Sequence, residues 1–143
     1  MSDDGCEFCA IVAGAVPARI VHRDEHTVAF FPLKPAVLGH TLVIPATHVP
    51  DIYELTPEIS GPLMATVQAG ARALREALQP EGLNVINSNG RAATQTVFHL
   101  HVHLVPRWQG DHIGSIWPPS EPWSETVKDE VADLVRAVWD GFD

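Results

Sequence analysis

Histidines alternate with apolar residues near the end of the chain, between Phe98 and Val105. A period of two is the side-chain period of a β-strand, whose residues point alternately to its two faces. The pattern therefore predicts a strand over residues 97–105 that buries Leu100, Val102 and Leu104 and lines up three imidazoles on its other face. Imidazole is suited to proton transfer, metal binding and attack on phosphorus near neutral pH, so this row of histidines predicts a functional site.

Turn residues and hydrophobic periods divide the rest of the chain into short elements. Helices are predicted at residues 6–12 and 125–139, and a longer one starts at Thr56-Pro57 and stops at Pro80 and Gly82. Strands are predicted at residues 19–23, 26–31, 40–44 and 83–87. We expect the α+β class, with an antiparallel sheet of about five strands, one long central helix and a C-terminal helix. The length of 143 residues predicts a single domain over 1–143.

Composition limits the class of partner and the compartment. Eighteen acidic against nine basic residues give a net charge of −9, which argues against nucleic acid as a partner. No apolar run approaches the length of a membrane span, and the acidic start lacks the pattern of a signal peptide. We therefore expect a cytoplasmic protein without a membrane partner, whose two cysteines stay reduced.

Two blocks of sequence together resemble the histidine triad (HIT) family. The first runs from Gln95 to Arg107 and contains the alternating histidines, and the second is the Gly-His-Thr-Leu-Val-Ile-Pro block within Pro35–Pro45. The start, Cys6-Glu7-Phe8-Cys9, is similar to the zinc-containing bacterial branch of that family. The resemblance extends from Cys6 to about Trp117 and implies a HIT-like fold and a homodimer.

The resemblance implies a nucleotide hydrolase that works through a covalent intermediate. His101 is expected to attack the α-phosphorus, His103 to donate to a phosphate oxygen or the leaving group, and His40 to assist from a neighbouring strand. Thr96 is expected near the leaving group. The expected substrate is a nucleotide phosphoramidate or a related phosphoanhydride. A neutral nitrogen is a suitable attacker because phosphorus carries oxyanions that repel an anion.

Polar residues before the histidines are candidates for holding the phosphate. They are Gln95 and the loop residues Ser88, Asn89 and Gly90, since backbone N–H groups of such loops form anion sites. For the base, the candidates are apolar side chains from the first half of the chain, of which we select Phe31 and Leu33; Phe30 and Ile11 are also available.

The Cys-x-x-Cys pair at the N-terminus indicates a metal site or a redox pair. No strand precedes Cys6 and Cys9, which argues against a thioredoxin-type pair. A closed zinc site needs four ligands, and His48 and His99 are available. The resemblance to zinc-containing relatives implies this set of four as a structural zinc site, and two free cysteines are the alternative.

Two positions depart from the pattern of the family. Pro32 stands where relatives place a residue that holds the ribose hydroxyls, and Thr94 stands where a glycine is common. Threonine disfavours a positive φ, so we expect a different loop geometry there. These departures keep a second hypothesis open, a non-catalytic, zinc-stabilised nucleotide-binding or adaptor module. A third, a histidine-rich metal carrier, is disfavoured because His99 and His103 lie too far apart on a strand to share one ion.

Overall fold

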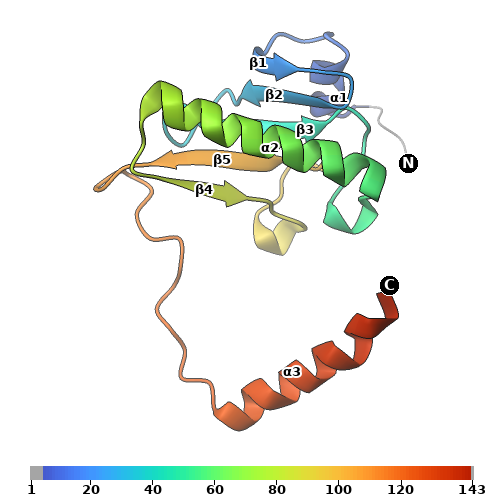
Figure 1. Cartoon of the computed structure of the whole chain (residues 1–143), viewed down its shortest axis with the longest axis vertical. Helices are drawn as coiled ribbons and strands as arrows, with labels where there is room; N and C mark the ends of the chain where they lie inside the picture. The colour runs from blue at the N-terminus through green and yellow to red at the C-terminus, as the bar shows by residue number, and fades with distance from the viewer. Residues whose placement is uncertain (1–4, 143) are drawn as a thin grey trace. The chain divides into compact units, whose positions relative to one another are not determined.

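The computed structural model describes residues 5–142, which fall into two compact units, one ending at His112 and one starting at Ile113. In the first unit, an antiparallel five-stranded sheet has the order β1-β2-β3-β5-β4 (Figure 1). Its elements are α1 (Glu7–Val12), β1 (Arg19–Arg23), β2 (Thr27–Phe31), β3 (Thr41–Pro45), α2 (Pro57–Leu78), β4 (Gly82–Ile86) and β5 (Val102–Arg107). This architecture confirms the predicted α+β class, and the element boundaries outside the histidine segment agree within one or two residues.

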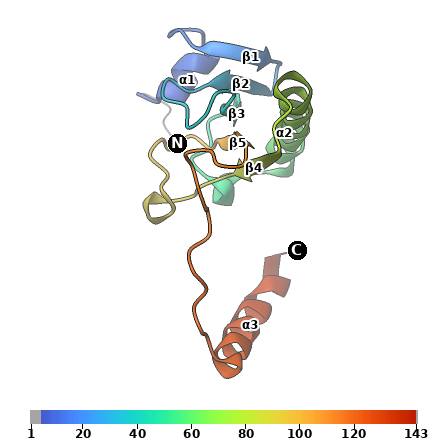
Figure 2. The same cartoon turned by 90° about the vertical axis from the view of Figure 1, so that its left-hand side faces the viewer.

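Helices α1 and α2 lie on opposite faces of the sheet (Figure 2). The period of two on β2 explains why: Phe30 packs with Phe8 of α1, whereas Ala29 belongs to the core under α2. The sheet therefore separates two apolar clusters. One contains Leu63, Val67 and Leu74 of α2, and the other contains Phe8 and Ile11 of α1.

Helix α2 begins where the sequence predicts, with Thr56 as its N-cap and Pro57 in its first turn. The Thr56 side chain makes no capping hydrogen bond. The helix lies close to β5 at Gly70, where an added Cβ would come within 2.8 Å of Leu104 Cδ1. A residue without a side chain at this position lets the helix approach the sheet.

The predicted strand over residues 97–105 is wrong in its first half. Strand β5 starts at Val102, so of the three alternating histidines only His103 lies in it, paired with Leu42 of β3. Before that point the chain leaves the ladder, because the Leu100 N–H donates to the Val49 carbonyl at 2.7 Å rather than to a strand. The alternation of side chains survives this change, since Leu100, Val102 and Leu104 are all buried in the core under α2.

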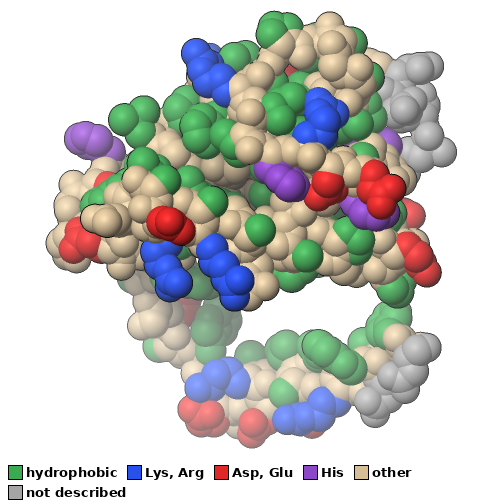
Figure 3. Space-filling model, turned by 45° about the horizontal axis from the view of Figure 1, so that its top comes forward, with side chains coloured by type: hydrophobic (Ala, Val, Ile, Leu, Met, Phe, Trp, Pro, Cys, Tyr) green, Lys and Arg blue, Asp and Glu red, His purple; other side chains and the backbone are tan. Residues whose placement is uncertain are grey.

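The second unit contains helix α3 (Glu125–Trp139), as the hydrophobic period predicts. Its apolar stripe, visible as green side chains along the helix in Figure 3, includes the exposed residues Val127, Val131, Leu134 and Val138. Lys128 pairs with Glu125 and Arg136 with Asp133 on the polar side. Of the helices that the structure describes, none has the length and hydropathy to cross a membrane. The single domain over 1–143 stays a prediction.

Candidate active site and metal centre

His101 has one ring nitrogen engaged and one bare. Its Nδ1–H donates to the backbone carbonyl of His99 at 2.8 Å, which places the proton of the neutral ring on Nδ1. Within residues 5–142, Nε2 makes no hydrogen bond. The side chain is 7% exposed, and burial lowers the pKa of His101 below its usual 6.5. At neutral pH the ring is therefore uncharged and carries a lone pair on Nε2.

A chain of two hydrogen bonds sets the tautomers of His40 and His103. The Ala36 N–H donates to Nδ1 of His40 at 3.0 Å, so His40 carries its proton on Nε2. That proton is donated to Nδ1 of His103 at 2.9 Å, which leaves the proton of a neutral His103 on Nε2. Burial, followed by the nearby His101 and His40, lowers the pKa of His103 to about 4. His103 thus offers an uncharged N–H donor next to the His101 ring, with 5.0 Å between the ring centroids.

The structure brings the predicted metal ligands together around Nδ1 of His99. The ligand atoms of Cys6, Cys9, His48 and His99 all lie within 4.8 Å of one another. Nδ1 of His99 is 3.5 Å from each sulfur and 3.2 Å from Nδ1 of His48, and Cys9 Sγ is 3.2 Å from the same His48 atom. A tetrahedral zinc ion with sulfur and nitrogen ligands needs separations of about 3.3–3.8 Å. The donor set and its spacing fit zinc.

His99 belongs to both the metal cluster and the histidine site. Its ring is fully buried, and its Nε2–H donates to the Pro45 carbonyl at 2.8 Å, so Nδ1 is the bare nitrogen that faces the cysteines. Its own backbone carbonyl accepts the proton of His101 Nδ1. The alternation that the sequence shows as a row of three thus divides into a candidate metal ligand, His99, and a pair of candidate site histidines, His101 and His103.

The candidate phosphate loop is braced largely by its own side chains. The amide of Gln95 is 2% exposed, donates to the carbonyls of Pro50 and Val97, and accepts from the Gly90 N–H at 2.8 Å. The Asn89 side chain accepts from the Ile52 N–H and donates to Asn87 Oδ1. These groups therefore hold the shape of the loop.

Two of the other predicted residues leave their hydroxyls available. Thr96 is exposed and Ser88 is partly buried, and neither side chain makes a hydrogen bond within the described part of the chain. The structure therefore leaves a hydroxyl donor available at Ser88, a predicted phosphate contact, and at Thr96, which is predicted near the leaving group.

Thr94 keeps the backbone that a glycine would adopt. Its φ is 74° and its ψ is 18°, in the left-handed region. Threonine therefore does not avoid the positive φ, which was the reason for expecting a different loop geometry here: the loop has a left-handed turn at a β-branched residue, at a cost in strain.

The predicted base-binding residues lie near the end of the sheet. Phe31 and Leu33 line a groove of about 560 Å³ together with Pro32 and His40. Leu33 is 87% exposed, whereas Phe31 also faces α2 through a neighbouring groove. Phe30, the neighbour of Phe31 in β2, points to the opposite face and packs on Phe8.

Sequence reasoning missed two residues that contact the segment around His101. Asn87 donates from Nδ2 to the His101 carbonyl at 3.0 Å. Phe8 places the edge of its ring against His101, with 5.1 Å between centroids. Asn87 follows directly after Ile86, which pairs with His103, so the strand register was the signal for it. Phe8 was signalled by its place between two predicted metal ligands, Cys6 and Cys9.

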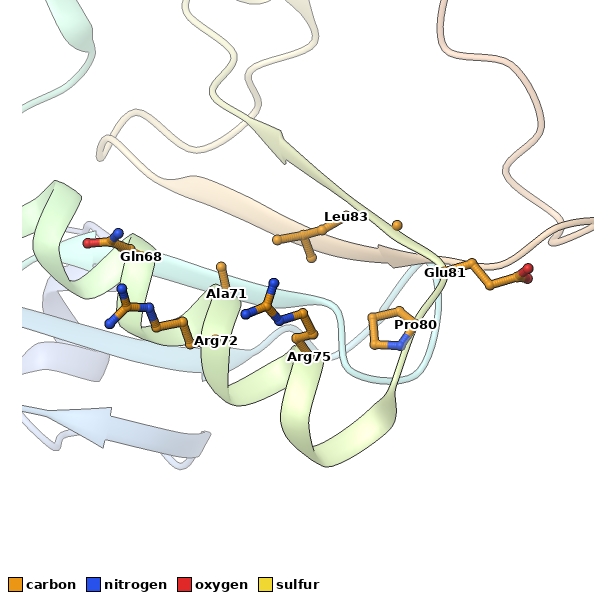
Figure 4. Close-up of a pocket in the computed structure, with 8 residues that line it drawn as sticks. Gln68, Ala71, Arg72, Arg75, Pro80, Glu81 and Leu83 are labelled. Carbon is orange, nitrogen blue, oxygen red and sulfur yellow. The ribbon is translucent and has the colours of Figure 1, made fainter.

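A groove on the other face of the sheet contains no histidine. It lies between the C-terminal half of α2 and β4, and Figure 4 shows the guanidinium groups of Arg72 and Arg75 extending from α2, with Leu83 of β4 above them in this view. Its remaining lining residues are Gln68, Ala71, Pro80, Glu81 and Gly82. The chemistry of the chain is concentrated instead at the histidines on the α1 side.

An open antiparallel sheet with His103 on β5, His101 directly before that strand and His40 beside them is the arrangement of a histidine triad protein. Comparison with known families gives the same result, since the family described as "HIT domain" matches residues 13–110. The chain belongs to the HIT family.

Several HIT family proteins and solved structures are similar to this chain over most of its length. "Protein hit" of Bacillus subtilis is 44% identical over 115 residues, covering 80% of this chain and 79% of the relative. A crystal structure of a HIT family member from Bacillus subtilis is 38% identical, with a TM-score of 0.86 over 94% of this chain and 96% of that one. A Zn-bound histidine triad family protein from Mycobacterium smegmatis is 39% identical, with a TM-score of 0.73 over 95% and 99%. Adenylylsulfatase HINT3 of Arabidopsis thaliana is 31% identical over 93% of this chain and 67% of the relative.

Proposed function

We propose that this protein is a nucleotide hydrolase or transferase that acts on phosphoramidates or related phosphoanhydrides through a nucleotidyl intermediate on His101. The observation that carries this proposal is the bare Nε2 of His101, on a neutral ring whose other nitrogen is held by the His99 carbonyl. A nucleophile of this kind needs a free lone pair at working pH and a fixed second nitrogen. The similarity to a plant adenylylsulfatase supports the same class of substrate.

In the first step, the lone pair of His101 Nε2 forms a bond to the α-phosphorus. The bond from phosphorus to the leaving group breaks, and the leaving group departs with the bonding electrons and takes a proton from water. In the second step, a water oxygen attacks phosphorus, the N–P bond breaks, and a nucleoside monophosphate leaves as the water proton passes to solvent. His101 then carries its lone pair again.

His103, His40 and Thr96 stabilise these steps in the proposal. His103 donates its Nε2–H to a phosphate oxygen or to the leaving group, and the hydrogen bond from His40 keeps that proton on Nε2. Thr96 supplies an exposed hydroxyl near the leaving group, and Ser88 supplies another for the phosphate. Gln95, Asn89 and Gly90 act by holding the loop, and Leu33 and Phe31 give an apolar surface for the base.

Zinc is the proposed resident metal, held by Cys6, Cys9, His48 and His99. A closed set of four protein ligands gives zinc a structural role, in which it ties α1 to the segment before β5. Within the described residues neither cysteine forms a disulfide, and metal binding requires both to be deprotonated and reduced, so the proposal places the protein in a reducing compartment such as the cytoplasm.

A homodimer completes the proposal. Strand β4 lies at the edge of the sheet, and Val85 on it and Met64 on α2 are 51% and 61% exposed. An unpaired edge beside apolar side chains is a surface that a second copy covers by extending the sheet. Light scattering coupled to size-exclusion chromatography should give twice the 15.6 kDa of one chain.

The test of the activity is a trapping experiment. The zinc-loaded protein is mixed with adenosine phosphoramidate, adenylylsulfate or a dinucleoside polyphosphate, quenched within one turnover, and analysed by mass spectrometry. We expect one nucleoside monophosphate on His101, and no adduct on His101→Ala or on His101→Asn, which has a similar polar shape. Nucleotide binding without an adduct or product in the wild type would favour the binding module instead.

A further inference from the structure

The nucleophile and the metal cluster are linked through helix α1, which is too short to be stable alone. It has six residues, well below the length at which an isolated helix persists in water. At its N-terminus, Cys6 and Cys9 belong to the metal cluster. At its C-terminus, the Arg23 guanidinium donates to the carbonyls of Val12 at 2.8 Å and Ile11 at 3.2 Å. The position of α1 therefore depends on these two anchors and on its buried side chains.

Phe8 lies on α1 between the two cysteines and reaches the nucleophile. Its side chain is 6% exposed and contacts three rings edge-on. The ring centroids are 5.1 Å from His101, 6.0 Å from His99 and 5.4 Å from Phe30, with interplanar angles of 88°, 68° and 75°. Such T-shaped contacts favour one orientation of each ring.

The hydrogen bond to the His99 carbonyl does not fix the plane of the His101 ring by itself. A single bond at Nδ1 restrains the ring but still allows it to rotate about the Cβ–Cγ bond within hydrogen-bonding range, because the outer torsion of a histidine side chain is broad. Nε2, the attacking atom, lies across the ring from that bond. The rings of Phe8 and His103, at 5.1 Å and 5.0 Å, limit this swing.

Resting on the function proposed above, we propose that Phe8 is a positioning residue: carried between Cys6 and Cys9, it holds the His101 ring at the angle of attack, so that occupancy of the metal site orients the nucleophile. Phe8 has no polar atom and takes no chemical part in the reaction. Its effect is on the placement of Nε2, and a displacement of about 1 Å of a reacting group lowers the rate about 100-fold.

The chain offers a matched control for this role. Ile11 lies one turn further along α1 and is buried in the same apolar cluster as Phe8, so it is not part of the groove proposed for the base. Ile11→Val shortens a buried side chain of α1 without changing the ring that faces His101. Phe8→Leu and Phe8→Met remove the ring but keep a large apolar side chain, and Phe8→Tyr keeps the ring.

The kinetic test compares single-turnover adduct formation with adenosine phosphoramidate in the zinc-loaded wild type and these variants. Phe8→Leu and Phe8→Met should bind one zinc per chain and form the adduct at least about 10-fold more slowly, with KM changed less than about threefold. Phe8→Tyr and Ile11→Val should retain the wild-type rate. A raised KM with an unchanged rate would overturn the proposal, because it would show that Phe8 binds substrate.

A second readout does not depend on turnover. Long-range ¹H–¹⁵N spectra of the imidazoles report the environment of the two His101 nitrogens with and without zinc. In the wild type, removal of zinc with a chelator should shift or broaden the His101 signals, and in Phe8→Leu it should leave them nearly unchanged. An equal response in both proteins would overturn the proposal, since the coupling would then run through the His99 backbone.

These outcomes separate the two proposals. Failure of the wild type to form any adduct, with the zinc response of His101 intact, would refute the hydrolase and leave the coupling through Phe8 in place. Normal adduct formation in both Phe8→Leu and Phe8→Met would refute the positioning role alone.

Discussion

The strained backbone at Thr94 gives the sharpest test of how this structure is built. Its φ of 74° costs a β-branched residue about 1–2 kcal/mol. Glycine removes this strain but loses about 0.5–1 kcal/mol more backbone entropy on folding. The side chain is exposed and bonds only to the adjacent Ala93 carbonyl, so its removal costs little else. Thr94→Gly should therefore stabilise the fold by about 0.5–1 kcal/mol, which raises Tm by about 1–4 °C for a chain of this size.

The assay is urea unfolding at a fixed zinc concentration, so that metal binding contributes equally to every variant. Gln79 is a matched control, because it also has a positive φ, 51°, but lies at the end of α2, and Gln79→Gly tests the same strain away from the loop. Thr94→Ala keeps the Cβ and should gain less than glycine. A Thr94→Gly protein that is no more stable than the wild type, with the same m-value, would refute the strain argument.

Three further results are expected. Because burial holds the pKa of His103 at about 4, the unfolded chain binds more protons than the folded one between about pH 4 and 6.5. The unfolding free energy should therefore fall as pH drops through this range, and it should fall less steeply with pH in a His103→Asn variant. Equal pH dependence in the two proteins would contradict the lowered pKa of His103. Cys9→Ser should lose zinc by metal analysis and lower Tm to that of chelated wild type, a loss of about 2.7 kcal/mol if zinc is present at 100 times its Kd; full zinc content would exclude Cys9 as a ligand. Gly70→Ala should cost about 1–3 kcal/mol in urea unfolding, because its Cβ would lie 2.8 Å from Leu104 Cδ1, whereas Gly61→Ala, in open space on the same helix, should not destabilise the protein.

Local sequence determined most of the elements of this protein. The period of apolar residues predicts α2 and α3, and prolines and turn residues predict the short strands, because these signals act within a few residues. The residues of the candidate site were also readable, since histidine and cysteine are rare residues with distinct chemistry. Their grouping into four metal ligands came from a resemblance, and spacing alone left it open.

The tertiary structure decided which partners each histidine ring meets. The sequence shows three equivalent imidazoles in a strand, but β5 begins only at Val102, and the segment before it follows Val49 instead of the sheet. Partners distant in the chain then set each ring: Pro45 and the cysteines for His99, and His40 for His103. These hydrogen bonds join atoms up to 93 residues apart, and the proton on each ring follows from which nitrogen meets a carbonyl or another imidazole. A local sequence pattern does not specify those contacts, because they form only when the chain is folded.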